Sequence, residues 1–340
     1  MKNFIQNRYI KSITTITPHR ISFAGGGTDY FDFFKKFEGE VINCTINQYL
    51  FVTVKKHGAI YPEKYRLMYS KTEFCNSISE IKNNIARECL RLVPVKGPIT
   101  ILVSSDLPPE SGTGSSSCFA VGLLNALHNF KGQPVSPSQI AKEACKVEVE
   151  ILKKNSGMQD QYAASFGGFN KFIFKKDNNI FIEPLNIKKK NLEKLFCNLR
   201  LIWTGEARNS SKIASSYNFK SKRTINCLIN IKNTVSITKN ILQEKKLSLK
   251  KLSKIFRYSW NIKKVISKKI TTKKINKFSS ILDLVGISGY RIIGAGGGGF
   301  FLTIASEKQI KKLNKYLPKV KVLNIKFERQ GSRVLSTLYI

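Results

Sequence analysis

The stretch LPPESGTGSSSCFAVGLL, residues 107–124, is the part of the sequence that most constrains the fold. It follows ITILVSS (99–105), which reads as a buried strand, and its apolar end continues as a predicted helix to about Lys131-Gly132. A strand, a glycine-rich loop and a helix in this order present the free N–H groups and the positive dipole end of the helix to the space in front. The stretch therefore predicts a phosphate-binding site.

The predicted phosphate cradle is the segment between the strand and the apolar helix. Its members are Gly112, Thr113, Gly114, Ser115, Ser116 and Ser117. The glycines allow close approach of the backbone to a phosphate, and the serine hydroxyls can cap the helix or ligate Mg²⁺. Capping alone accounts for one serine and leaves the Gly-Thr-Gly unexplained. The lysine of the G-x-x-x-x-G-K-[ST] loop is missing, so the site is not a Walker A loop.

Two further glycine clusters flank this segment at a distance. In PHRISFAGGGTDY (18–30), three successive glycines would bring the backbone close to a ligand, beside Arg20, Asp29 and Tyr30. Alone, such a turn is more often structural than functional. The other cluster, GAGGGGF (294–300), formally matches G-x-G-x-x-G, but FFLTIA after it reads as a strand and only about forty residues remain. A dinucleotide-binding interpretation is therefore rejected.

The charge of the chain is unusual, with a net value of +36. Residues 211–280 carry 19 Lys or Arg and one acidic residue, Glu244. These lysines recur among Ile, Leu and Asn, as on the solvated faces of amphipathic helices, and no RNP-like, zinc-finger or helix-turn-helix signal accompanies them. A biased, solvated surface is the favoured interpretation, ahead of attraction for anionic substrates or a nucleic-acid site.

Length and composition set the remaining limits. With 340 residues, of which 42% are apolar, the chain can form two domains with substantial cores. The seven cysteines are scattered without a C-x-x-C pair, which favours a reducing compartment over a disulfide framework or a zinc site. Neither a signal peptide nor a run of ~18 apolar residues is evident, so we expect a cytoplasmic protein without a membrane partner.

The pattern along the chain predicts a mixed α+β fold without regular βαβ alternation. Strands are expected in the first 60 residues, in 171–203 and around the last glycine cluster. Helices are expected from Asn76, with a cap in the Ser77/Ser79 region, from Pro137 to Lys153, and through most of 211–280. A boundary near residues 185–205 divides the chain into domains 1–190 and 191–340.

The three glycine clusters, in this order and spacing, resemble the three motifs of the GHMP kinase superfamily over nearly the whole chain. The likeness extends to YSKTEFCNSISEIKNNIARECL, GMQDQYAASFGGFN, LIWTGEARNSSKI and SGYRIIGAGGGGF. Within the superfamily, GGGTD is most similar to the bacterial branch that phosphorylates heptose 7-phosphate, where galactokinases have GEHTD. Asn83-Asn84 and Arg291 depart from that branch, which commonly has His-Pro and Lys there. The resemblance implies an S5-domain-2-like N-terminal domain and a ferredoxin-like C-terminal domain.

The resemblance also implies roles for individual residues. Asp160 matches the catalytic aspartate that orients the attacking hydroxyl, and Arg20 matches a cation near it and the γ-phosphate. Ser116 matches the Mg²⁺-ligating serine, and Glu148 is the best match for the second ligand, with Glu150 as an alternative. The implied substrate-binding residues are Gly25, Gly26, Gly27, Thr28, Asp29, Arg208 and Arg291. Gly296, Gly297, Gly298 and Gly299 are expected to pack beside the phosphate cradle.

The function implied is transfer of phosphate from ATP, with Mg²⁺, to the anomeric hydroxyl of a heptose 7-phosphate. Glycines where galactokinase has bulkier residues would widen the pocket for a seven-carbon substrate, and Arg208 and Arg291 are the candidates for its phosphate. A galactokinase- or fucokinase-like enzyme acting on an unphosphorylated sugar is the alternative. A basic nucleic-acid-binding protein on an inactive kinase scaffold is the alternative of another class; it predicts loss of Asp160 or of the serines, which are present. A homodimer is possible.

Overall fold

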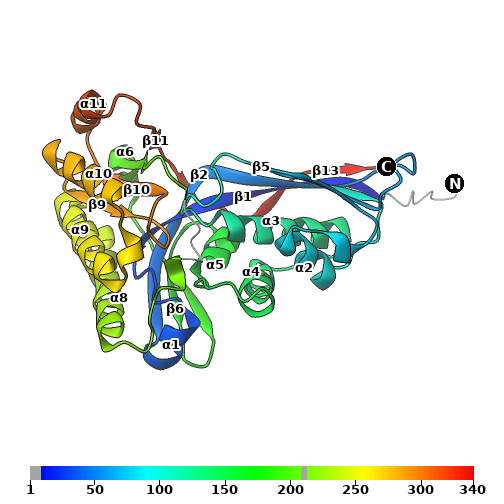
Figure 1. The fold of residues 1–340 in the computed structure, drawn as a ribbon, viewed down its shortest axis with the longest axis horizontal. Coiled ribbons are helices and arrows are strands. Elements are labelled where there is room, and N and C mark those ends of the chain that lie inside the picture. Colours follow the sequence, from blue (N-terminus) through cyan, green and yellow to red (C-terminus); the bar gives the residue numbers. More distant parts are fainter. Residues whose placement is uncertain (1–8, 208–212) are drawn as a thin grey trace.

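The computed structural model describes residues 9–207 and 213–340, and in these residues two sheets are flanked by helices (Figure 1). The larger sheet has the order β13-β1-β2-β5-β3-β4, while β12 and β6 also pair with β2, and β7 with β6. Its strands are β1 (Ile10–Ala24), β2 (Gly39–Lys56), β3 (Tyr65–Met68), β4 (Thr72–Cys75), β5 (Ile99–Ser105), β6 (Phe169–Phe174), β7 (Ile180–Pro184), β12 (Phe327–Glu328) and β13 (Arg333–Tyr339). The smaller sheet, β11-β8-β10-β9, contains β8 (Leu199–Trp203), β9 (Gly289–Ile292), β10 (Phe300–Ile304) and β11 (Val322–Asn324). The predicted α+β class is confirmed.

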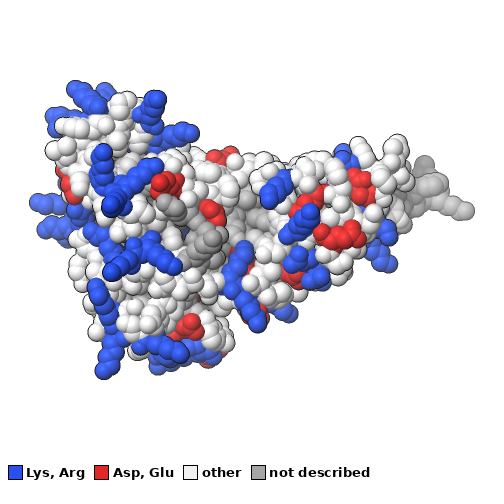
Figure 2. All heavy atoms as spheres, viewed as in Figure 1, with Lys and Arg blue, Asp and Glu red and all other residues white. Residues whose placement is uncertain are grey.

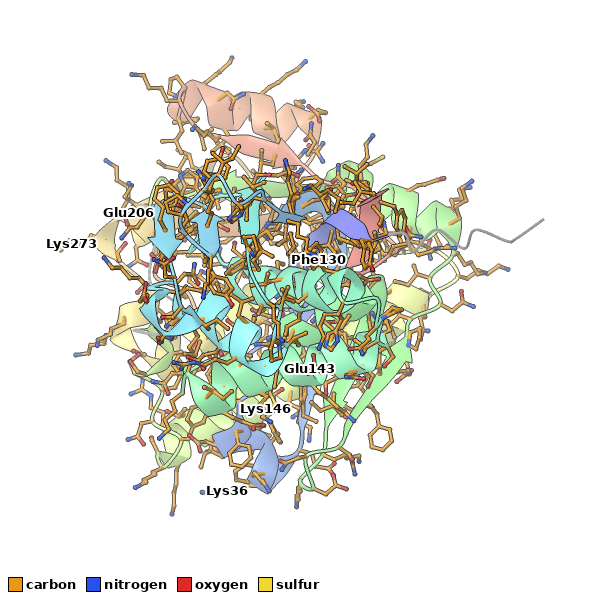
Figure 3. The ribbon with its side chains drawn as sticks, turned by 90° about the vertical axis from the view of Figure 1, so that its right-hand side faces the viewer. Lys36, Phe130, Glu143, Lys146, Glu206 and Lys273 are labelled. Carbon is orange, nitrogen blue, oxygen red and sulfur yellow. The ribbon has the colours of Figure 1, made fainter. Side chains whose placement is uncertain are left out.

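Helices cover one face of the larger sheet and surround the smaller one (Figure 1). Those of the first half are α1 (Phe31–Phe37), α2 (Asn84–Leu92), α3 (Ser115–Phe130), α4 (Pro137–Cys145), the π-helix η2 (Lys146–Ile151) and α5 (Gln159–Phe166), with a 3₁₀ turn η1 (Ile78–Glu80). Those of the second half are α6 (Lys189–Asn198), α8 (Lys222–Gln243), α9 (Leu249–Ile266), η3 (Lys268–Ile270), α10 (Lys273–Leu284) and α11 (Glu307–Tyr316). Figure 3 shows the helical layer of the first half, where Phe130, Glu143 and Lys146 mark α3, α4 and η2.

One apolar cluster joins the two halves. Phe23 of β1, Phe256 of α9 and Leu302 of β10 belong to it, and each is almost completely buried. The rings of Phe23 and Phe256 lie 5.7 Å apart, edge to face, a favoured geometry for aromatic pairs. Because a buried ring of this size contributes about 3–5 kcal/mol relative to alanine, the shared core fixes the two sheets against each other.

The C-terminal strands of the chain pair with the larger sheet. After β11, strand β12 pairs with β2 and β13 pairs antiparallel with β1, with Ser336 opposite Thr14. The pairing satisfies N–H and C=O groups along an edge of β1 that would otherwise be open. Residues 327–339 thus lie in the larger sheet, although the sequence placed them in a domain 191–340. The boundary near residue 190 remains a prediction.

Helix α2 begins later in the chain than the sequence predicted. The sequence suggested a cap at Ser77 or Ser79, but α2 begins at Asn84 and the Asn83 side chain caps it by accepting from the Ala86 N–H. The Glu73 carboxylate accepts from the backbone N–H groups just before α2 and holds them outside the helix.

In the described residues no helix is both long and apolar enough to cross a membrane. Lysine and arginine side chains spread over the half that carries α8 to α10 (Figure 2).

Candidate active site

A cavity of about 250 Å³ is lined by residues from both halves of the chain. It brings together most of the residues predicted from the sequence, namely Arg20, Gly26, Gly27, Asp29, Gly112, Gly114, Ser115, Ser116, Ser117, Glu148, Asp160 and Arg291. Gly25, Thr28, Thr113 and the glycines 296–299 lie outside its lining. Arg208 falls outside the described residues. The three glycine clusters therefore meet at one site.

The start of α3 has the form expected of a phosphate cradle. Gly114 is the N-cap residue, with a φ of 81° that favours glycine. The first helical hydrogen bond runs from the Cys118 N–H to the Gly114 carbonyl, 2.9 Å, so the N–H groups of residues 115–117 precede the helical ladder. None of the serines caps the helix. Three N–H groups and a helix dipole are thus presented to an anion.

The third glycine cluster supports the cradle by backbone contact. A Cβ atom added at Gly299 would lie 2.3 Å from the Ser111 carbonyl oxygen, and one at Gly294 would lie 2.7 Å from the Gly112 Cα. Such distances leave no room for a side chain, so these glycines allow the two loops to touch. Gly296 and Gly297 instead pack against η3.

His19 supports the cradle from the other side. Its ring nitrogens lie 3.1 Å from the Thr113 hydroxyl and 3.1 Å from the Ser105 hydroxyl. Burial, more than any other influence, lowers the pKa of His19 to about 4. The ring is therefore neutral near pH 7 and can accept a hydrogen bond from one hydroxyl while it donates to the other.

Buried Arg20 and partly exposed Asp160 form a bidentate pair beside the cradle. The Arg20 Nε and Nη2 atoms donate to the two carboxylate oxygens of Asp160, each at 2.7 Å, and Nη1 donates to the Gly112 carbonyl at 2.7 Å. All three nitrogens of the guanidinium are thereby fixed. Asp160 reaches the cradle itself, since a Cβ atom at Gly114 would lie 3.3 Å from its Oδ2. A carboxylate and a fixed cation thus lie directly beside the cradle.

Glu148 reaches the cradle from the π-helix η2 and is 2% exposed. It accepts hydrogen bonds from the Ser116 hydroxyl, from the Ser117 hydroxyl at 2.6 Å and from the Gln161 amide at 2.8 Å. Glu150, the alternative left open by the sequence, is exposed on the same π-helix. The position of its side chain therefore favours Glu148 over Glu150 as the predicted metal ligand. A π-helix at such a position is a recurrent feature of functional sites.

A positive charge is already held between these groups. The Lys154 ammonium lies 2.8 Å from the Ser116 hydroxyl and 3.1 Å from a Glu148 carboxylate oxygen. One hydroxyl and one carboxylate are oxygen ligands of the kind that Mg²⁺ accepts, and the ammonium shows that the pair accommodates a cation. Ser116 and Glu148 would hold Mg²⁺, which when bound supplies charge that neutralises the nucleotide phosphates.

Asp29 enters the cavity from the triglycine loop. Its carboxylate oxygens accept from the Gly27 N–H at 3.0 Å and from the Gln159 N–H at 3.2 Å. Burial, and then the charge of Asp160, raise the pKa of Asp29. Thr28, predicted to bind substrate, does not line the cavity, because it is fully buried and its hydroxyl bonds to the backbone of the loop and of β2.

Alanine at Gly25 is expected to destabilise the protein by at least about 2 kcal/mol. The φ angle of Gly25 is 79°, and an added Cβ would lie 1.9 Å from the Glu40 carbonyl oxygen. Urea unfolding followed by circular dichroism measures the change. Gly58→Ala is the matched control, since no atom lies within 4 Å of its added Cβ, and we expect a change within about 0.5 kcal/mol. Equal stabilities of the two variants would contradict the loop geometry.

Sequence reasoning missed several residues of the cavity, among them Ser22, Lys154, Gln159, Tyr217 and Lys263. For Lys263 a signal existed. The buried residues of α9 include Leu252, Phe256 and Trp260, and Lys263 continues their spacing on the apolar face. A lysine at such a position differs from the exposed lysines around it.

The fold and this cavity are those expected of a small-molecule kinase that would bind nucleotide phosphates at a helix N-terminus. Residues 76–168 match the family model of the GHMP kinases N terminal domain. Together with the similarity to curated kinases, this match identifies the chain as an ATP-dependent phosphotransferase with an alcohol group as acceptor.

The chain is similar to individual sugar kinases of known sequence or structure. The chain is 29% identical, over 95% of its length and 98% of the relative, to D-glycero-alpha-D-manno-heptose 7-phosphate kinase of Campylobacter jejuni. Among solved structures, a D-glycero-D-manno-heptose 1-phosphate kinase from Bacteriodes thetaiotaomicron has a TM-score of 0.77 at 21% identity, covering 95% of this chain and 99% of that one. Lactococcus lactis galactokinase complexed with galactose has a TM-score of 0.72 at 14% identity, covering 95% of each chain. The last two likenesses concern the fold alone.

Proposed function

We propose that the protein uses Mg·ATP to phosphorylate the anomeric hydroxyl of D-glycero-D-manno-heptose 7-phosphate, giving the 1,7-bisphosphate for nucleotide-activated heptose synthesis. The observation that carries the proposal is that Asp29, the Arg20–Asp160 pair and the phosphate cradle line one cavity. Gly26 and Gly27 line the cavity there without side chains, next to the Arg20–Asp160 pair. The choice of sugar is supported by the similarity to the Campylobacter jejuni heptose 7-phosphate kinase.

In the proposed reaction each group has one task. The cradle N–H groups bind the nucleotide phosphates, and Arg20 offsets charge that develops on the transferred group. Asp160 accepts a hydrogen bond from the anomeric hydroxyl and takes its proton as the oxygen attacks the γ-phosphorus, the bond from that phosphorus to the β–γ bridging oxygen breaks, and ADP leaves. Asp29 orients neighbouring sugar hydroxyls, so the anomeric oxygen is the one that approaches phosphorus.

A substrate panel tests the proposal. With Mg·ATP, we expect kcat/KM for heptose 7-phosphate to exceed that for the unphosphorylated heptose, galactose and fucose by at least about 100-fold, because a bound phosphate contributes several charge-assisted hydrogen bonds. ADP release measures turnover, and phosphorus NMR identifies the product. Faster turnover of a free hexose would instead favour the galactokinase- or fucokinase-like alternative. Salt-sensitive DNA binding without ADP release would favour the nucleic-acid-binding alternative.

A further inference from the structure

Two buried cations in the cavity have no carboxylate partner among the described residues. Lys263 of α9 and Arg291 of β9 are 5% and 2% exposed, and both line the cavity. The other two cations of the lining are paired, Arg20 with Asp160 and Lys154 with Glu148. Because burial of an unpaired charge is costly, these two cations call for an anion that is not part of the described protein.

The hydrogen-bonding capacity of both groups is largely unused. Arg291 donates through Nη1 to the Phe23 carbonyl at 2.9 Å, while its buried Nε has no partner among the described residues. The Lys263 ammonium donates one hydrogen bond to the Gly294 carbonyl, and its two other N–H groups can still donate. Burial, followed by repulsion from neighbouring arginines, lowers the pKa of Lys263 to about 7. Arg20, by contrast, uses all three guanidinium nitrogens within the protein.

The Arg291 guanidinium faces the triglycine loop. A Cβ atom added at Gly26 would lie 3.2 Å from the Ser22 hydroxyl oxygen, 3.7 Å from Arg291 Nη2 and 3.8 Å from Gln159 Nε2. The Ser22 hydroxyl and the Gln159 carbonyl oxygen are also buried and lack a partner among the described residues. Several unsatisfied polar atoms thus surround one small space, whereas buried polar atoms in folded proteins are nearly always bonded.

We propose that Lys263 and Arg291, with the Ser22 hydroxyl, form a subsite for a phosphate group carried by the acceptor sugar. The inference rests on the proposed function and names further residues that would bind the substrate. Arg291 was predicted from the sequence as a ligand of the sugar phosphate, whereas Lys263 and Ser22 were not. A phosphate monoester carries nearly two negative charges and three acceptor oxygens, which matches two cations and one hydroxyl. The phosphates of ATP have their own donors at the start of α3, on the cradle.

Kinetics with matched variants test the subsite. Lys263→Met and Arg291→Met are expected to raise the KM for heptose 7-phosphate at least about tenfold and to leave the KM for ATP within about twofold. Lys264→Met removes the same charge from the next position of α9, where the ammonium lies over the Trp260 ring, and should leave both constants unchanged. An equal rise in both KM values, or no rise in either, would overturn the subsite.

A binding experiment separates this inference from the identity of the sugar. With the nucleotide site saturated by Mg·ADP, inorganic phosphate is expected to raise the melting temperature of the wild type and of Lys264→Met, but not of Lys263→Met. Absence of a phosphate effect on the wild type, or an equal effect on all three proteins, would refute the subsite. A phosphate effect lost only in Lys263→Met supports it, even where the substrate panel shows that heptose 7-phosphate is inert and the proposed function fails.

Discussion

Asparagine at Asp160 is expected to lower kcat by about 1,000-fold, with little change in the KM for ATP. The two side chains have the same shape, and the amide oxygen can still accept one hydrogen bond from Arg20. The amide cannot take a proton from the acceptor hydroxyl, and its NH₂ group would face a donor of the guanidinium, which now binds both carboxylate oxygens at 2.7 Å. Steady-state ADP release with the preferred sugar measures the loss.

The control must separate chemistry from folding. Asp177→Asn alters an exposed aspartate whose carboxylate bonds to Asn179 near the start of β7, and it should keep full activity. The melting temperatures of both variants should lie within a few degrees of that of the wild type. An Asp160→Asn enzyme with more than about a tenth of wild-type kcat would show that another group accepts the proton.

The local parts of the site could be predicted from the sequence. Glycine and serine at the start of a helix create an anion site by backbone geometry alone, so residues 112–117 could be located without knowledge of the fold. The positions of Arg20 and Asp160 depended on the family resemblance, because 140 residues separate them and no local pattern indicates that they touch. Their placement in one cavity agrees with the predicted roles.

The parts that could not be predicted depend on tertiary packing. Lys154 carries no special local pattern, yet the turn after η2 brings it to Ser116, 38 residues earlier in the chain. The π-helix that points Glu148 inward cannot be read from apolar spacing, since the predicted α-helix through residue 153 has nearly the same pattern. Likewise, β13 pairs with β1 only because the fold leaves that edge open.

Glutamine at Glu148 is expected to raise the Mg²⁺ concentration for half-maximal activity at least about tenfold and to lower kcat by about 100-fold. The substitution keeps the size of a side chain that is 2% exposed, but removes the negative charge beside the Ser116 hydroxyl. Titration calorimetry of ADP with and without Mg²⁺ gives a measure independent of turnover. The Mg²⁺-dependent gain in ADP affinity should shrink in the variant.

Glu150→Gln is the matched control, because it removes the same charge from an exposed position of the same π-helix. If Glu148 only held the fold, Glu148→Gln would lower the melting temperature while the Mg²⁺ dependence stayed as in the wild type. If it holds the metal, the metal dependence shifts even where stability is kept. Lys154 sharpens the distinction: its ammonium bonds to Glu148 and Ser116, so Lys154→Met should not weaken Mg²⁺ binding if the two cations compete for the same oxygens. A parallel loss of Mg²⁺ affinity in Lys154→Met would instead mean that the ammonium organises the site.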